Sequence, residues 1–175
     1  MTRVSLIAAV AGALAATIPA AVHAAEKPAK GAADAAKATP AQINRGRYLL
    51  VVGNCNDCHT AGFAPSEGKV PEKDWLLGEG KLGLRGPWGT TYATNLRLSL
   101  SKMTEEQWVK YARTLKTRPP MPWFNVNQWT PTDLRAFYQY VRQLGPVGTA
   151  VPDALPPGKE PPPPYIQWPA GPPKK

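Results

Sequence analysis

Histidine and cysteine are scarce in this chain, whose 175 residues contain two of each. His23 lies in an N-terminal segment with the pattern of an export signal, so the mature chain would keep His59 alone. If His59 has another role, no histidine remains for a Ser-His-Asp catalytic triad. Two cysteines and one histidine also fall short of the four ligands of a structural zinc site. The scarcity argues against a hydrolase and against a zinc protein.

Acidic residues are also few, with 12 Asp+Glu against 21 Lys+Arg and a formal net charge of +9. Removal of residues 1–24 takes away only Arg3 and leaves 20 basic against 12 acidic residues, or +8. Such a charge favours encounter with acidic protein surfaces or with an anionic membrane surface, although simple solubility explains it equally well. No nucleic-acid-binding module is recognisable, so nucleic acid is not an expected partner.

A hydrophobic run long enough to span a membrane, about 20 residues, is lacking as well. The apolar run at residues 4–18 follows Arg3 and stops before Pro19, and Val22 and Ala24 are small residues suited to signal-peptide cleavage. We therefore expect residues 1–24 to be a signal peptide and the mature protein to be periplasmic. An uncleaved membrane anchor is the alternative.

Both cysteines and the remaining histidine fall in one pentapeptide, Cys55-Asn56-Asp57-Cys58-His59. This is the attachment pattern of c-type haem. On one helical turn both thiols share a face and can form thioethers along one porphyrin edge, while the next imidazole binds the iron. We expect one haem c, bound covalently through Cys55 and Cys58, with His59 as an iron ligand. The alternatives are a redox dithiol, half of a zinc site and a chance occurrence. A redox dithiol would be expected in a βαβ context.

The second axial ligand of the iron must be another residue type, because the mature chain has no second histidine; methionine is the usual alternative. Met121 lies in a proline-rich stretch, residues 118–123, whose stiff backbone suits a ligand loop. Met103 directly precedes an expected helix cap at Thr104 and can pack there. Met121 is the expected ligand, with Met103, a lysine, water or an open site as alternatives.

Helix signals recur at three threonines, Thr39, Thr104 and Thr130, each followed by proline or an acidic first turn. Gly46 falls inside the first expected helix, where glycine is unfavourable, so we expect the third helix to cross there. Residues 60–102 show no sustained periodicity and are expected to be loop that wraps the haem, with Asn95 or nearby backbone N–H groups as candidates for binding its propionates.

Composition divides the chain into four parts. Residues 1–24 are the signal peptide, residues 25–40 a flexible leader, residues 41–148 the folded domain and residues 149–175 a proline-rich tail. The tail can be a spacer, a strap on the domain or a docking peptide for a partner subunit.

Four stretches recur in the same order in a known family: residues 55–59, 87–96, 121–124 and 133–138. On these motifs the chain resembles class I c-type cytochromes. It is most similar to single haem domains in the cytochrome c subunits of periplasmic alcohol and gluconate dehydrogenases. The resemblance implies an all-α cytochrome c fold, with three to four main helices around one covalently attached haem and long haem-wrapping loops. It also implies crossed first and last helices and Met121 as the distal ligand. The chain differs from those subunits in having one attachment motif rather than three.

The expected function is therefore that of an exported monohaem cytochrome, not an enzyme. It would carry single electrons between periplasmic or membrane redox proteins as the iron cycles between Fe2+ and Fe3+. It could also be the electron-accepting subunit of a dehydrogenase complex, contacted through its tail. The alternative function is a haem-based sensor or a small peroxidase with an open sixth coordination site.

Overall fold

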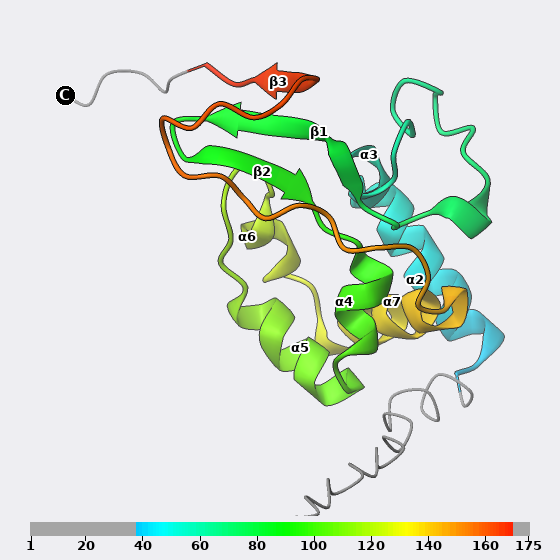
Figure 1. Cartoon of the computed structure of the whole chain (residues 1–175). Helices are drawn as coiled ribbons and strands as arrows, with labels where there is room; N and C mark the ends of the chain where they lie inside the picture. Colours follow the sequence, from blue (N-terminus) through cyan, green and yellow to red (C-terminus); the bar gives the residue numbers. More distant parts are fainter. Residues whose placement is uncertain (1–37, 170–175) are drawn as a thin grey trace, which may run out of the picture.

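The computed structural model describes residues 38–169 (Figure 1). The expected signal peptide, most of the expected leader and residues 170–175 lie outside the described residues. The helices are α2 (Pro40–Val52), α3 (Cys55–His59), α4 (Leu96–Ser101), α5 (Glu105–Thr114), α6 (Trp123–Val126) and α7 (Pro131–Leu144), with a 3-10 turn, η1, at Glu72–Asp74. The strands are β1 (Glu79–Gly86), β2 (Gly89–Ala93) and β3 (Tyr165–Gln167).

The three helices expected from the sequence all form, and the expected threonines cap them. The Oγ atoms accept hydrogen bonds from the backbone N–H groups three residues later, in the pairs Thr39–Gln42, Thr104–Gln107 and Thr130–Asp133. Each cap satisfies a backbone donor that has no partner within the first helical turn. Gly53 ends α2, and the chain passes directly into α3.

Helices α2 and α7 cross at Gly46, as predicted. A Cβ atom at this position would overlap the backbone carbonyl of Ala136 and would lie 2.8 Å from Cβ of Tyr140. Only glycine allows the two backbones to approach so closely. The crossing buries one face of α7, and the core cluster includes Leu50 of α2 together with Leu134 and Val141 of α7.

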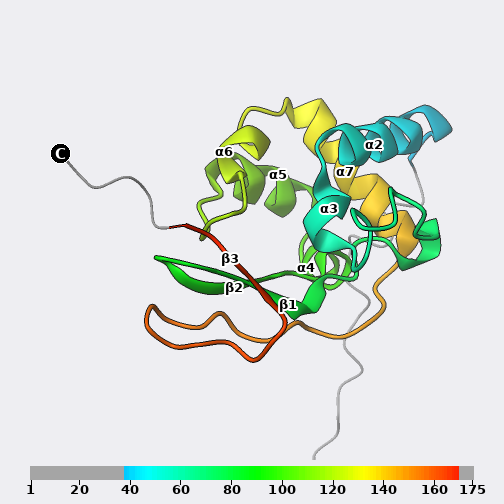
Figure 2. The ribbon, with the colours of Figure 1, turned by 90° about the horizontal axis from the view of Figure 1, so that it is seen from above.

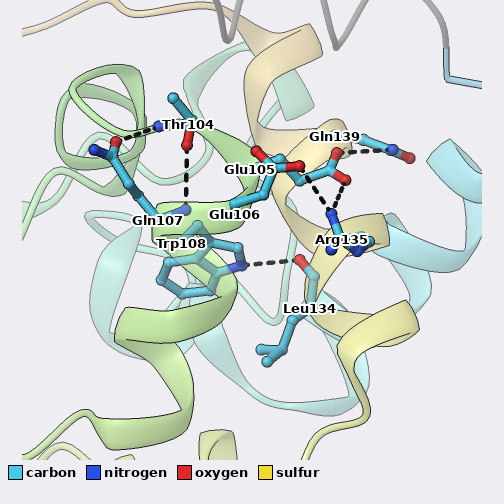
Figure 3. A network of polar contacts seen from close by, with 8 residues as sticks. All are labelled: Thr104, Glu105, Glu106, Gln107, Trp108, Leu134, Arg135 and Gln139. Carbon is cyan, nitrogen blue, oxygen red and sulfur yellow. Dashed lines mark hydrogen bonds and ion pairs between the residues drawn. The ribbon is translucent and has the colours of Figure 1, made fainter.

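Helix α5 is fixed to α7 by a polar network (Figure 3). The indole N–H of Trp108 donates to the carbonyl oxygen of Leu134 at 2.8 Å. The buried carboxylate of Glu105 accepts hydrogen bonds from Arg135 at 2.7 Å and from Gln139 at 2.9 Å. These contacts set the position of α5, and with it the start of the segment that carries Met121.

Residues 60–102, expected to be loop, contain a β-hairpin. Strands β1 and β2 pair antiparallel, and β3 adds to the other side of β1 in parallel, which gives the order β2-β1-β3. Strand β1 carries glycine at positions 80, 83 and 86, so it lacks the alternation of side chains that signals a strand. The structure shows why glycine stands there: a Cβ at Gly80 would lie 3.0 Å from Pro152, and one at Gly83 3.3 Å from Tyr165.

The proline-rich tail lies along the domain as far as Trp168 and is called the strap here (residues 149–168). Figure 1 shows it leaving α7, running along β2 to the tip of the hairpin and returning along β1 as β3; Figure 2 shows the same path from above. Thr90 and Leu155 exchange two backbone hydrogen bonds, of 3.0 and 2.9 Å, and the N–H of Trp168 donates to the carbonyl of Arg85 at 2.7 Å. Of the three possibilities for the tail, the structure shows the strap.

Within residues 38–169, no helix combines the length and the apolar character needed to cross a membrane.

Candidate functional site

The attachment motif forms a short helix of its own, α3, which spans Cys55–His59. Asn54 precedes it with a positive φ of 54°, and this left-handed residue turns the chain out of the direction of α2. Cys55 and Cys58 therefore stand on a single helical turn, as the sequence predicted. Both thiols are free; Cys55 is partly buried and Cys58 is exposed. The arrangement presents two sulfur atoms on one turn, with an imidazole directly after the second.

The environment of the two thiols does not suit a redox dithiol. Burial raises the pKa of the Cys55 thiol to about 12. The surrounding protein atoms partly desolvate the Cys58 thiol, and this effect, together with the nearby carboxylate of Asp57, raises the pKa of Cys58. Reactive dithiols have a lowered thiol pKa, because the thiolate is the nucleophile. Within the described chain, no three side chains of His, Cys, Asp or Glu gather as a metal-binding group.

His59 is buried, with 8% of its surface exposed, and its ring orientation is fixed by one hydrogen bond. Nδ1 lies 2.7 Å from the backbone oxygen of Thr94. A carbonyl can only accept, so the proton resides on Nδ1 and Nε2 keeps a free lone pair. Burial lowers the pKa of the imidazole, although this hydrogen bond acts in the opposite direction. The lowered pKa keeps the ring neutral. A neutral, oriented imidazole with an available Nε2 is the form that binds metal ions.

A second set of hydrogen bonds holds α3 against the following chain. Thr60 Oγ1 donates to Asn56 Oδ1 at 2.7 Å and accepts from the N–H of Leu76 at 2.8 Å. The carbonyl of His59 accepts from the N–H of Gly78 at 2.8 Å. Asn56 and Thr60 are each 1% exposed. The sequence analysis did not identify these positioning residues, because a buried role for an asparagine inside the motif has no local signature.

Met121 lies in the segment between α5 and α6 and is partly buried. Thr91 Oγ1 donates to the carbonyl of Pro119 at 3.0 Å, so this segment is tied to β2. The chain that follows β2 contains Thr94, which accepts the hydrogen bond of His59. One short stretch, residues 91–94, thus contacts both the His59 side and the Met121 segment. Met103, the alternative ligand, is also partly buried, and its carbonyl accepts from the hydroxyl of Tyr138 at 2.8 Å.

Asn95 was a candidate for binding propionates, and the structure gives it another role. Its Oδ1 accepts from the N–H of Leu98 at 3.0 Å and caps α4. Its Nδ2 donates to the carbonyls of Val147 at 3.0 Å and Thr149 at 3.3 Å. In the structure the Asn95 amide thus joins α4 to the start of the strap.

Comparison with known proteins gives one informative similarity. No family model matches the chain, and no solved structure matches it. The chain is 28% identical over 109 residues to the fructose dehydrogenase cytochrome subunit of Gluconobacter japonicus, an alignment that covers 57% of this chain and 20% of that protein. The chain thus spans about a fifth of the length of this relative. The similarity supports a relation to cytochromes and, at the level of function, a role in electron transfer.

Proposed function

We propose that this protein is an exported monohaem c-type cytochrome that carries single electrons and catalyses no reaction of its own. Cys55 and Cys58 would hold the haem through thioethers, and His59 and Met121 would be the axial ligands of its iron. The described residues fit this group in their chemistry: two free thiols on one helical turn, a neutral imidazole with Nε2 available, and a thioether in a restrained segment. When bound, the haem would supply a one-electron Fe2+/Fe3+ couple.

The observation that carries the proposal is the hydrogen bond from His59 Nδ1 to Thr94. It fixes the tautomer in which Nε2 is the ligand atom and joins the motif helix to the end of β2. Such a contact to a backbone carbonyl is the usual support of a metal-binding imidazole and raises its basicity as a ligand. Packing alone would not explain why the buried His59 follows two free cysteines on the same helix.

The proposed fold is the all-α cytochrome c fold, formed by α2, α3, α5 and α7, with the sheet and the strap as additions to it. The crossing of α2 and α7 at Gly46 supports this assignment. The sheet does not disturb the crossing, because β1 and β2 belong to the long connection between α3 and α4.

The proposed partners are redox proteins, and the proposed location is the periplasm. The similarity to a cytochrome subunit of a dehydrogenase supports a partner of that kind. The formal net charge of +8 that remains without residues 1–24 supports partners with acidic docking surfaces. Association with an anionic membrane surface would follow from the same charge.

Haem attachment can be tested on the exported protein by intact mass and by its haem spectrum after denaturation. The proposal expects the mass of one haem on the wild-type polypeptide, retained in denaturant. It expects no covalent haem on a Cys55→Ala, Cys58→Ala double variant. A matched Lys69→Ala variant, changed at an exposed position, should carry the same haem as the wild type. A wild-type polypeptide that leaves the export pathway without added mass would contradict the proposal.

A further inference from the structure

A groove of about 900 Å³ lies on the side of the molecule where the strap passes β2 and α4. One wall is formed by residues between 91 and 102, a second by residues 116–119, and a third by residues 150–154 of the strap. Arg118 reaches across, and its guanidinium donates to the strap carbonyl of Leu155 at 3.4 Å. The groove is therefore built from three segments that are distant in sequence.

The charged side chains of the groove are mostly cationic. Lys102 stands at the C-cap of α4, Lys116 and Arg118 follow α5, and Asp153 of the strap is the one acidic residue among those that line it. All four are exposed to solvent. Among residues 38–169, no carboxylate forms an ion pair with any of the three cations. The groove thus offers unpaired positive charge to an incoming ligand.

The walls of the groove are the segments that position the two proposed iron ligands. Thr94, in the first wall, accepts the hydrogen bond from His59. Pro119, in the second wall, is tied to Thr91 and stands two residues before Met121. A partner seated in the groove would contact the two segments that support His59 and lead to Met121.

We infer that this groove is the docking site for an acidic, carboxylate-rich segment of a redox partner protein, and that electrons are exchanged there. The inference rests on the proposed function. The exchange is one electron between this protein and the partner's own one-electron centre, with no bond made or broken and no proton transferred.

The exposure of the cations favours a protein partner over a small anion. Sites that hold small ligands tightly place polar groups in buried, preformed positions. Exposed lysine and arginine side chains instead suit transient docking, in which charge complementarity speeds encounter and orients the partners.

The test uses hexacyanoferrate(III) as an anionic oxidant of the reduced holoprotein, followed by stopped-flow absorption. A Lys116→Glu, Arg118→Glu variant should react roughly tenfold more slowly than wild type at low ionic strength, since a charged site raises the local concentration of opposite charge. A Lys69→Glu, Lys159→Glu variant changes the net charge equally at exposed positions outside the groove and should react much as wild type does. Added salt should remove the difference.

A cationic oxidant, tris(phenanthroline)cobalt(III), should show the opposite order, with the groove variant reacting faster. Equal rates for the groove variant and its control, in a protein that carries haem, would overturn the inference and leave the proposed function standing. A protein that carries no covalent haem would instead contradict the proposed function itself, and the mass measurement reveals this first.

The class of partner is tested by competition. Poly-L-glutamate should slow the reaction of wild type with hexacyanoferrate(III) and should have little effect on the Lys116→Glu, Arg118→Glu variant. If inorganic phosphate competes but poly-L-glutamate does not, the groove binds small anions only and the assignment to an acidic protein segment is wrong.

Discussion

Single buried polar groups hold distant segments of this molecule together. The imidazole of His59 reaches the backbone of Thr94, 35 residues further on. Arg97 has the same kind of role at a second place: with 4% of its surface exposed, it donates to the carbonyls of Lys73 at 2.7 Å, Gly145 at 2.6 Å and Leu144. In both cases one side chain satisfies backbone oxygens that no helix or strand partner reaches.

Replacing Arg97 by methionine should lower the free energy of unfolding by about 3 kcal/mol. The variant removes charged donors from three carbonyls, two at the end of α7 and one in η1, and a hydrogen bond to a charged group contributes about 1.5 to 3 kcal/mol. Arg97→Lys should lose less, because an ammonium group keeps the charge but cannot reach all three oxygens. Urea denaturation of the holoprotein measures the free energy of unfolding of both Arg97 variants. An Arg97→Met variant as stable as wild type would contradict the role of Arg97 in holding these segments together.

At the scale of the elements, the contact of α2 with α7 is the most constrained. Gly46→Ala should lower the free energy of unfolding by about 3 kcal/mol, since the added methyl group overlaps the backbone of Ala136. Helix propensity alone would favour alanine by about 1 kcal/mol. A loss of stability therefore indicates overlap with α7, and a gain indicates that helix propensity dominates. Asn44→Ala, at an exposed position of the same helix, is the control and should be neutral or stabilising. A stabilised Gly46→Ala variant would show that the helices do not cross there.

The same helix pair should make stability depend on pH. Arg45 donates to Asp133 at 2.8 Å, and this hydrogen bond holds the pKa of the Asp133 carboxyl below its ordinary value of 3.8, against the opposing effect of burial. The stabilisation is present above the pKa of the unfolded state and is lost as pH falls through the lower folded-state pKa.

The difference in unfolding free energy between wild type and Arg45→Gln should therefore be larger near pH 6 than below pH 3, because these pH values lie on either side of the ordinary aspartate pKa of 3.8. Lys159→Gln, which removes an exposed charge without such a contact, should show little difference at either pH. A difference between wild type and Arg45→Gln that stays constant from neutral to acid pH would mean that this pair does not titrate as described.

The helices could be predicted from the sequence and the sheet could not, for a physical reason. Helix ends are set by local contacts between residues three or four apart, and Thr39, Thr104 and Thr130 are all capping residues that the sequence shows directly. Strand β1 is instead set by its neighbours, because its glycines make room for Thr90, Pro152 and Tyr165. Two of these three contacts come from the strap, more than 60 positions further along the chain.

The site was predicted to a similar extent. Cys55, Cys58 and His59 follow one another closely, so the pattern that links them is local. The carbonyl of Thr94 belongs to the backbone and leaves no trace in the residue type, so only the structure identifies it. The role of Asn95 was also not predictable: it looks like a polar loop residue in the sequence, but it caps α4 and contacts the start of the strap.

At the scale of the whole molecule, the strap joins the sheet to the rest of the chain. Truncation after Gly148 removes β3, the Thr90–Leu155 bridge and one wall of the groove, and it leaves the edge of β1 unpaired. The truncated protein should unfold at lower temperature than wild type and still carry haem, because the attachment motif precedes the cut. Truncation after Pro169 keeps every described strap contact and is the control. Equal melting temperatures for both truncated proteins would show that the strap adds nothing to stability.

The central claim is that the molecule is an electron carrier with His59 and Met121 as axial ligands of one haem. The most direct test is the absorption spectrum of the purified ferric protein in the far red, where a methionine sulfur bound to iron gives a weak charge-transfer band. We expect wild type and Met103→Ala to show the band and Met121→Ala to lose it and to bind carbon monoxide rapidly once reduced. A wild-type protein without the band, with a high-spin spectrum, would have an open sixth site and would be a sensor or a small peroxidase rather than a carrier.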